Sequence, residues 1–354
     1  MKPLFEPLPL RSVITPNRIG MSPMCMYSYK DGIVTNFQAV HLGSRAIGGV
    51  GLIIAEATAV QAIGRITPYD AGIWNDGQIS AHAHTVEAIK AGGAVAGIQL
   101  AHAGRKASTD KPWTGGKPIL PNQEGGWQPI APSAIAFADD FVTPTQMTQL
   151  DLDQLRQSFV DAARRALSAG YQFIEIHAAH GYLLHSFLSP LANNRTDSYG
   201  GIFENRIRLL IEIVDGIRAV WPDVLPLGVR LSATDWHEGG WTISDSVELA
   251  KVLKIHGVDL VDCSSGGILP TIKIPVAPGY QVPFAEQVRR EATMMTAAVG
   301  LITDPEQANL IIETGQADMV LLGRRLLSEP YWPQTAAKIL GAANIIPNQY
   351  LRGH

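Results

Sequence analysis

Short apolar runs alternate with longer amphipathic segments along almost the whole chain. Segments with helical spacing lie at Ile79–Ala91, Leu155–Ala169, Val247–His256 and Ala308–Thr314. Eight runs between and around them are near-continuously apolar, as strands buried on both faces are, and they lie at Ile19–Pro23, Gly51–Ala57, Ala94–Leu100, Gln172–His177, Leu225–Leu231, Val258–Ser264, Ala298–Thr303 and Met319–Gly323. This order predicts a parallel sheet whose strands are joined by helices.

Start and stop signals accompany these predicted helices. Residues that cap helix N-termini precede them, namely Asp76, Asp151, Ser244 and the pair Asp304-Pro305. Glycines that suit a left-handed position follow them, namely Gly92, Gly170, Gly257 and Gly315. The strand–helix unit is therefore regular along the chain.

The regular units favour an α/β fold of the (β/α)8 TIM-barrel type. A doubly wound sheet would normally carry a glycine-rich dinucleotide turn after its first strand, and neither G-x-G-x-x-G nor G-x-x-x-x-G-K-[ST] occurs. We expect a single domain over residues 1–354, with Lys2–Arg18 as a cap over the barrel's bottom. A long excursion at 103–148 follows the third strand, and a tail at 345–354 follows the last helix.

Composition and charge narrow the class of protein. The chain has 28 Lys+Arg and 32 Asp+Glu, a net charge of −4, and 46% hydrophobic residues. Such a chain builds a large core and gives no electrostatic reason to expect nucleic acid or an anionic membrane as partner. The expected partners are therefore small molecules or protein. Only Cys25 and Cys263 are present and the N-terminus lacks a signal-peptide pattern, so a cytoplasmic location is expected.

Polar residues gather where the predicted strands end, which in a barrel is a single mouth. His177 and His180, three residues apart, end the fourth strand. As a metal pair they would need further ligands, and the other strand ends offer only Glu56, so no metal is predicted. As hydrogen-bond donors they could hold a carbonyl or phenolate oxygen, while ordinary structural histidines are the remaining alternative.

Two tyrosines and a cysteine stand near these histidines. Tyr182, with an unperturbed pKa near ~10, could donate a proton to a carbanion, or it could simply pack in the core. Tyr27 could converge on the same space, although such a tyrosine is more often structural. Cys25 has no neighbouring base in the sequence, so an inert buried thiol is the better expectation.

The last strands offer an anion site. Gly323-Arg324, next to Gly300, matches the phosphate site of barrels, although a salt-bridged arginine is the alternative. Together with Arg230 and Gln99, this suits a flat, phosphorylated ligand that forms hydrogen bonds, and FMN has that description. A Schiff-base aldolase is disfavoured because Lys106 and Lys273 lie in loops.

Several long motifs resemble the Old Yellow Enzyme family over nearly the whole chain. They are SPMCMYS, IIAEATAV, GRITPYDAGIW, IQLAHAGRKA, APSAIAF, EIHAAHGYLLHSFLSPLANNRTDSYGG, ENRIRL and VDCSSGG. Cys25 makes the chain similar to the bacterial branch often called NADPH dehydrogenase or xenobiotic reductase. The resemblance implies non-covalently bound FMN, reduced by NADPH and reoxidised by an activated alkene such as an enone, maleimide or nitroalkene.

The resemblance also implies residue roles. His177 and His180 would bind the substrate's activating oxygen, Tyr182 would protonate the α-carbon, and Tyr27 would line the substrate pocket. Cys25 would tune the flavin's redox behaviour. FMN would be held by Ser22, Pro23, Met24, Cys25, Ala57, Gln99, Arg230, Val299, Gly300, Gly323 and Arg324.

The C-terminal LRGH is similar to the R-G-W terminus of that branch. The resemblance implies a homodimer or homotetramer in which Arg352 reaches the neighbouring subunit's active site, while His354 stands where tryptophan is usual. An alternative function also stays open at this point: a flavin-binding redox sensor that responds through Cys25.

Overall fold

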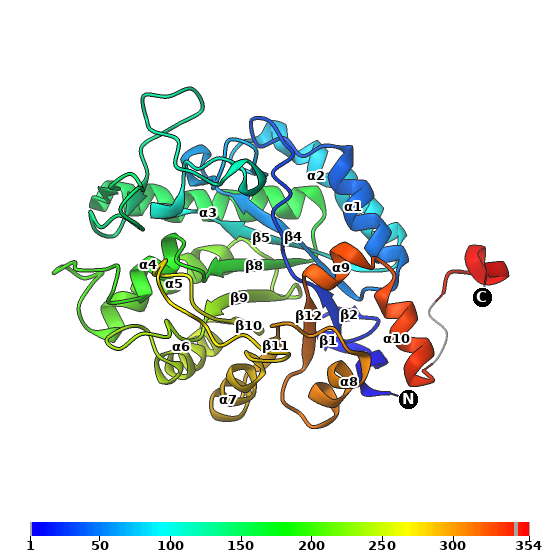
Figure 1. The fold of residues 1–354 in the computed structure, drawn as a ribbon. Coiled ribbons are helices and arrows are strands. Elements are labelled where there is room, and N and C mark those ends of the chain that lie inside the picture. Colours follow the sequence, from blue (N-terminus) through cyan, green and yellow to red (C-terminus); the bar gives the residue numbers. More distant parts are fainter. Residues whose placement is uncertain (1, 343–345, 354) are drawn as a thin grey trace.

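Eight parallel strands close into a barrel in the computed structural model, which describes residues 2–342 and 346–353 (Figure 1). The strands are β3 (Ile19–Met21), β4 (Leu52–Ala59), β5 (Val95–Ala101), β8 (Phe173–Ala178), β9 (Leu227–Ser232), β10 (Leu260–Ser264), β11 (Met295–Ala298) and β12 (Met319–Leu322). The barrel closes because β12 pairs with β3 in parallel, Val320 opposite Ile19. The predicted (β/α)8 barrel is confirmed.

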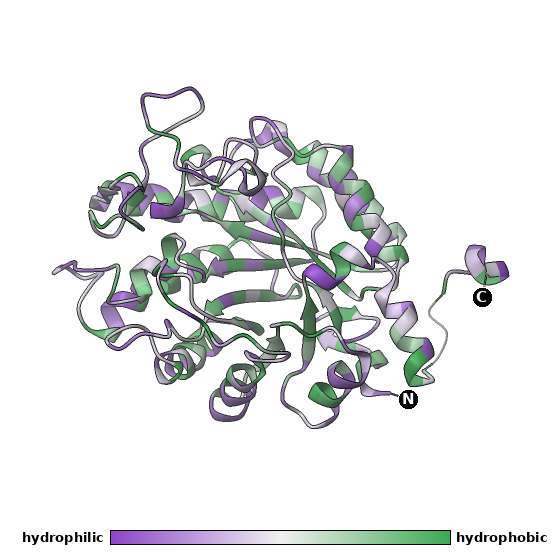
Figure 2. Cartoon of the chain, in the orientation of Figure 1, coloured by the Kyte–Doolittle hydropathy of each residue, from purple (hydrophilic) through white to green (hydrophobic). Residues whose placement is uncertain are grey.

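Helices surround the strands. They are α1 (Asn36–Ile47), α2 (Ile79–Ala91), α3 (Gln149–Ala169), α4 (Leu183–Leu188), α5 (Phe203–Arg218), α6 (Ile243–Ile255), α7 (Val282–Ala292), α8 (Pro305–Glu313), α9 (Arg324–Ser328) and α10 (Trp332–Leu340). Figure 2 shows mostly hydrophobic strands inside helices of mixed hydropathy. The longer helices, such as α3 and α5, thus turn an apolar stripe to the barrel and a polar one to solvent.

The N-terminal segment closes one end of the barrel. After the short helix η1 (Pro3–Phe5), the strands β1 (Leu8–Leu10) and β2 (Val13–Thr15) form an antiparallel hairpin. Leu8 and Leu10 are buried in one cluster with Leu52 and Phe173 of the barrel strands. The expected cap at the barrel's bottom is therefore present.

The excursion between β5 and α3 has little regular structure. It contains the short helices η4 (Gly104–Lys106) and η5 (Pro112–Thr114) and the paired strands β6 (Ile130–Ala131) and β7 (Thr145–Gln146). Other short helices are η2 (Ala62–Gly64), η3 (Asp76–Gln78) and η6 (Asn348–Gly353). The Trp113 ring contacts the Tyr27 ring with centroids 5.8 Å apart, so the excursion reaches the mouth of the barrel.

The predicted position of the seventh strand was wrong. Ala298–Thr303 was expected, but β11 ends at Ala298, because the backbone pairing to β10 and β12 uses Met295–Ala298. The apolar run continues past the strand into a loop, where Ile302 is buried. The run of apolar residues is therefore longer than the strand, and it did not mark where the strand ends.

Two predicted helix starts were late. α3 is capped by Thr148, whose hydroxyl accepts from the backbone N–H of Asp151, while the Asp151 carboxylate accepts from the N–H of Thr148. α6 is capped in the same way by Thr242 with Asp245, not by Ser244. In both helices an acid three residues inside completes a capping box.

The glycine predictions held at three of four positions. Gly170, Gly257 and Gly315 have φ of +90°, +82° and +73°. Gly92 does not, because its φ is −79° and the next residue, Gly93, takes the left-handed conformation at +91°. The turn after α2 therefore comes one residue later than predicted.

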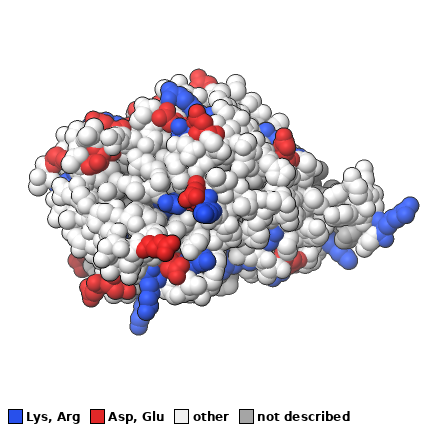
Figure 3. All heavy atoms as spheres, turned by 90° about the horizontal axis from the view of Figure 1, so that it is seen from above, with Lys and Arg blue, Asp and Glu red and all other residues white. Residues whose placement is uncertain are grey.

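The described surface mixes charges of both signs. On the face drawn in Figure 3, acidic and basic side chains are interspersed among uncharged ones. Among the described residues, no helix combines the length and apolar character that a membrane span needs.

Candidate functional site

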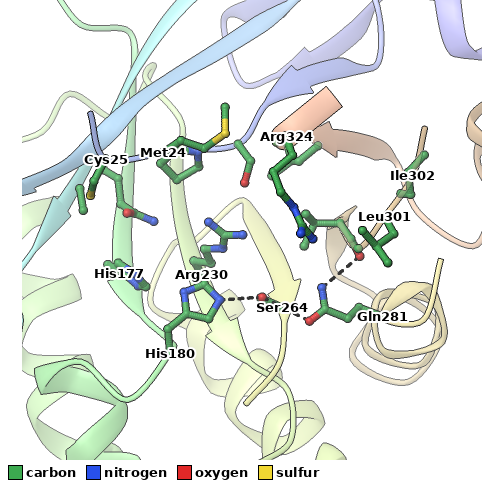
Figure 4. Close-up of a pocket in the computed structure, with 18 of the residues that line it drawn as sticks. Met24, Cys25, His177, His180, Arg230, Ser264, Gln281, Leu301, Ile302 and Arg324 are labelled. Carbon is green, nitrogen blue, oxygen red and sulfur yellow. Dashed lines mark hydrogen bonds between the residues drawn. The ribbon is translucent and has the colours of Figure 1, made fainter. Parts of the chain in front are cut away.

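A cavity of about 380 Å³ opens at the C-terminal ends of the barrel strands (Figure 4). Every residue predicted for the site lines it except Arg352, namely Ser22, Pro23, Met24, Cys25, Tyr27, Ala57, Gln99, His177, His180, Tyr182, Arg230, Val299, Gly300, Gly323 and Arg324. The barrel brings them together because the strand ends share one mouth.

The β8 strand and the turn after it carry the histidines and Tyr182. His177 lies on β8 opposite Arg230 of β9, and both side chains line the cavity. The turn then takes left-handed conformations at His180 (φ +61°) and Gly181 (φ +74°). A Cβ on Gly181 would lie 2.1 Å from the carbonyl oxygen of Gly267, so glycine is required before Tyr182.

The two imidazoles lie side by side and are uncharged. Their ring centroids are 5.2 Å apart and their planes differ by 85°. Burial, followed by the positive charge of Arg230, holds the pKa of both His177 and His180 well below the ordinary value. At neutral pH each ring therefore has one N–H donor and one bare nitrogen.

Hydrogen bonds occupy one nitrogen of each ring. The backbone N–H of Ala179 donates to Nδ1 of His177 at 3.3 Å. Nε2 of His180 lies 2.7 Å from the hydroxyl of Ser264. One nitrogen of each ring is left for a ligand oxygen.

Tyr182 keeps its proton. Its ring centroid is 5.0 Å from that of His177, and burial raises the pKa of its phenol far above the ordinary value. The Lys106 ammonium lies 5.1 Å from the Tyr182 ring centroid and donates to the carbonyl oxygen of His180 at 2.9 Å. Burial, and then Arg105, lowers the pKa of Lys106 to about 8.

Cys25 and Tyr27, in the segment that follows β3, form one wall of the cavity. Burial raises the pKa of both side chains, so both keep their protons at neutral pH. Glu56, behind this wall, accepts from the backbone N–H of Met26 at 2.9 Å and from the hydroxyl of Tyr29 at 2.6 Å. A protonated thiol is a weak nucleophile, in agreement with the inert role expected from the sequence.

A buried network fixes the polar floor of the cavity. Nε2 of Gln99 donates to the carboxylate of Glu175 at 2.7 Å, which leaves the carbonyl oxygen of Gln99 as the acceptor available to a ligand. Nε of Arg230 lies 2.8 Å from a carboxylate oxygen of Asp262 in a buried ion pair. Burial raises the pKa of Glu175, and the negative charge of Asp262 raises it further.

Among the described arginines that line the cavity, Arg324 is the one without a partner. Among the described residues its guanidinium makes no hydrogen bond or ion pair, whereas the neighbouring Arg325 pairs with Glu329 at 2.5 Å. Figure 4 shows the Arg324 side chain reaching into the cavity. An unpaired guanidinium for phosphate, the Gln99 carbonyl for an imide N–H and the Arg230 cation for the ring edge together fit FMN.

Two expectations concern the tail and metal binding. In the described part of the chain, no three His, Cys, Asp or Glu side chains come together in a way that could hold a metal ion.

Arg352 lies in η6, which projects from the body of the molecule away from the cavity (Figure 1). Its contact with a neighbour stays a prediction, and His354 lies outside the described residues.

Nine cavity-lining residues were not predicted for the site, and they are Ile66, Ser264, Tyr280, Gln281, Leu301, Ile302, Thr303, Leu321 and Arg325. Ser264 ends β10, as a strand-end residue should, so its position was a usable signal. Gln281 had none, because it precedes α7 and reaches the cavity only through the course of its loop.

Comparison with known proteins agrees with this geometry. The family model described as NADH:flavin oxidoreductase / NADH oxidase family matches residues 3–342. The NADPH dehydrogenase of Geobacillus sp. (strain WCH70) is 51% identical over 352 residues, which are 99% of this chain and 98% of the relative. That of Bacillus subtilis (strain 168) is 49% identical, with the same two shares.

Solved structures also match nearly the whole chain in fold. Morphinone reductase superposes with a TM-score of 0.81 at 29% identity, over 97% of this chain and 91% of that chain. The old yellow enzyme homologue from Zymomonas mobilis gives 0.79 at 27% identity, over 96% and 93%. The predicted resemblance, the flavin-dependent oxidoreductase class, and its FMN and nicotinamide requirements are confirmed at the level of the family. The chain belongs to the NADH:flavin oxidoreductase / NADH oxidase family.

Proposed function

We propose that this protein is an FMN-dependent ene-reductase that uses NADPH to reduce activated alkenes such as enones, maleimides and nitroalkenes. The observation that carries the proposal is the group of two neutral imidazoles and one protonated phenol, His177, His180 and Tyr182, in the cavity that fits FMN. The family and the relatives named NADPH dehydrogenase support the cofactor and the co-substrate.

When bound, FMN supplies a two-electron carrier that takes hydride from NADPH and passes it to the β-carbon of the alkene in a ping-pong sequence. Gln99, Arg230 and Arg324 would hold its polar groups. The other residues that would surround it are Ser22, Pro23, Met24, Cys25, Ala57, Val299, Gly300 and Gly323. The cationic Arg230 would favour the negative charge that the bound cofactor gains on reduction.

The histidines bind the oxygen that activates the alkene. Hydride addition at the β-carbon moves negative charge onto the conjugated carbonyl or nitro oxygen. N–H donors from His177 and His180, 5.2 Å apart between ring centroids, stabilise that charge. Since both rings are neutral, they donate hydrogen bonds and keep their protons.

Tyr182 then completes the reduction. Its phenol keeps its proton at neutral pH because burial disfavours the phenolate. It donates that proton to the α-carbon, and the proton is replaced from solvent before the next turnover. Tyr27, on the facing wall of the cavity, lines the space for the alkene.

The assignment is tested by the spectrum of the purified protein. It should be yellow, bleach under anaerobic conditions with NADPH, and recover its colour on addition of 2-cyclohexenone. Protein purified gently without bound flavin would contradict the proposal. A His177→Ala/His180→Ala double variant should keep its flavin but lose the charge-transfer band with a phenol, and a retained band would remove the histidines from the mechanism.

A further inference from the structure

The edge of His180 that faces β10 is in contact with a serine hydroxyl. Oγ of Ser264, the last residue of β10, lies 2.7 Å from Nε2 of His180, and Ser264 is only 5% exposed. Among the described residues, Nδ1 of the same ring has no hydrogen-bond partner, and the side chain lines the cavity. The two nitrogens of His180 therefore have different surroundings.

The position of one proton decides what His180 can do. The ring is neutral, so it carries a single N–H. With the proton on Nδ1, His180 donates to a ligand oxygen in the cavity. With the proton on Nε2, it presents a lone pair to that oxygen instead, and the two repel.

The hydroxyl of Ser264 has two acceptors within reach. One is Nε2 of His180 at 2.7 Å, and the other is Oε1 of Gln281 at 3.4 Å. That Gln281 oxygen already accepts from the hydroxyl of Ser265 at 2.6 Å. The closer and otherwise unfilled acceptor is the imidazole nitrogen, and Figure 4 shows Ser264 between the two side chains.

We propose that Ser264 fixes the tautomer of His180 by donating its hydroxyl proton to Nε2, so that Nδ1–H points to the substrate oxygen. Ser264 is then a positioning residue for the ene-reductase reaction, and this inference rests on the function proposed above. It acts through His180 and need not touch the substrate itself.

His177 follows the same logic with the opposite nitrogen. The backbone N–H of Ala179 donates to its Nδ1 at 3.3 Å, which places the ring proton on Nε2. One imidazole is thus oriented by a backbone amide and the other by a side chain. Both become single donors toward the same space, which a pair of unoriented neutral rings would not be.

The direct test is the nitrogen NMR spectrum of FMN-loaded protein labelled with ¹⁵N-histidine, with His180 assigned by loss of its signals in His180→Asn. In the wild type, Nδ1 of His180 should bear the proton and Nε2 should resonate as a bare nitrogen that accepts a hydrogen bond. Ser264→Ala should move the proton to Nε2 or leave the two tautomers mixed. Ser264→Thr keeps the hydroxyl and should retain the wild-type pattern.

Ligand binding gives a second readout, with 4-hydroxybenzaldehyde as the probe. Ser264→Ala should weaken its binding by about tenfold or more, the loss expected for one hydrogen bond to an anionic oxygen, with FMN still bound. Ser264→Thr should stay within about twofold of the wild type.

Two results would overturn the inference: a wild-type His180 protonated on Nε2, or a Ser264→Ala protein with unchanged tautomer and unchanged affinity. The wild-type spectrum decides even if a variant does not fold. A protein that fails to reduce any alkene but shows the Nδ1–H tautomer would contradict the proposed function alone. Alkene reduction with the other tautomer would contradict only the role of Ser264.

Discussion

The ring of Tyr182 meets the ring of His177 edge to face, with centroids 5.0 Å apart and planes 77° apart. The end of β8 and the turn after it therefore present both a proposed donor for the substrate oxygen and the proposed proton source. The left-handed backbone at His180 and Gly181 shapes the turn that brings the two side chains together.

Tyr182→Phe should separate the two halves of the reaction. The variant keeps the ring contact with His177 and removes only the hydroxyl. In stopped-flow experiments, reoxidation of the reduced enzyme by 2-cyclohexenone should slow by about 10²-fold, the usual contribution of a general acid, while reduction by NADPH is unchanged. An unchanged reoxidation rate would assign the proton to another donor, such as water.

Asp262→Asn should affect both the flavin and the fold. It removes the partner that lies 2.8 Å from Arg230, so a buried cation loses its counter-charge. The flavin midpoint potential should rise, because an uncompensated cation favours the anionic reduced form. Unfolding should become easier by roughly 3 kcal/mol, as for other broken buried pairs.

A matched control is available on the surface. Glu248 pairs with Lys251 at 2.7 Å, but both side chains are well exposed. Glu248→Gln should cost less than about 1 kcal/mol and leave the potential unchanged. Equal losses in the two variants would mean that burial of the Asp262 pair is irrelevant.

Glu56→Gln should flatten the pH dependence of stability. Burial raises the pKa of Glu56 from 4.5 to about 7, so the folded state holds a proton that the unfolded state has released. Its contribution is therefore complete below pH 4.5 and is lost as the pH rises through about 7. The loss should amount to roughly 3 kcal/mol by linkage.

The measurement is urea unfolding of both proteins from pH 5 to 8. The wild type should lose stability over this range relative to Glu56→Gln, which has no proton to release at that position. Parallel curves would mean that Glu56 is ionised in the folded protein at pH 5.

The Cys25 thiol should resist alkylation in the folded protein. Because burial raises its pKa, little thiolate is present at pH 7.5, and iodoacetamide should label it far more slowly than in urea-unfolded protein, as followed by mass spectrometry. A redox sensor would need the reverse. Rapid labelling, or rapid oxidation by hydrogen peroxide with loss of activity, would favour the sensor function instead.

Arg352→Ala should reveal a contribution from a neighbouring subunit. We propose that the tail carries Arg352 into the cavity of a second copy within a dimer or tetramer, because η6 lies away from the cavity of its own chain. The variant should raise KM for the alkene severalfold with the same mass by sedimentation. If KM and mass are both unchanged, the tail has no role in the site.

The strand-end residues could be predicted because parallel strands in a barrel leave no choice about where their ends meet. His177, Arg230 and Gln99 come from different units of the chain, yet the same rule placed each in the cavity. The choice among the possible roles of these residues, in contrast, came from the family resemblance.

What the sequence could not predict depends on contacts between distant segments. The end of β11 is set by pairing with β10 and β12, whereas the apolar run itself continues to Ile302. The contact between His180 and Ser264 joins residues 84 positions apart, and Gln281 reaches it from a loop. No local pattern encodes such a pairing.

The hairpin of β1 and β2 closes one end of the barrel with Leu8 and Leu10, so in the proposed reaction nicotinamide and alkene would both enter through the opposite end. The reactant that binds first then blocks binding of the other. A large excess of either reactant should therefore inhibit turnover. The highest rate is expected when neither concentration is in large excess over the other.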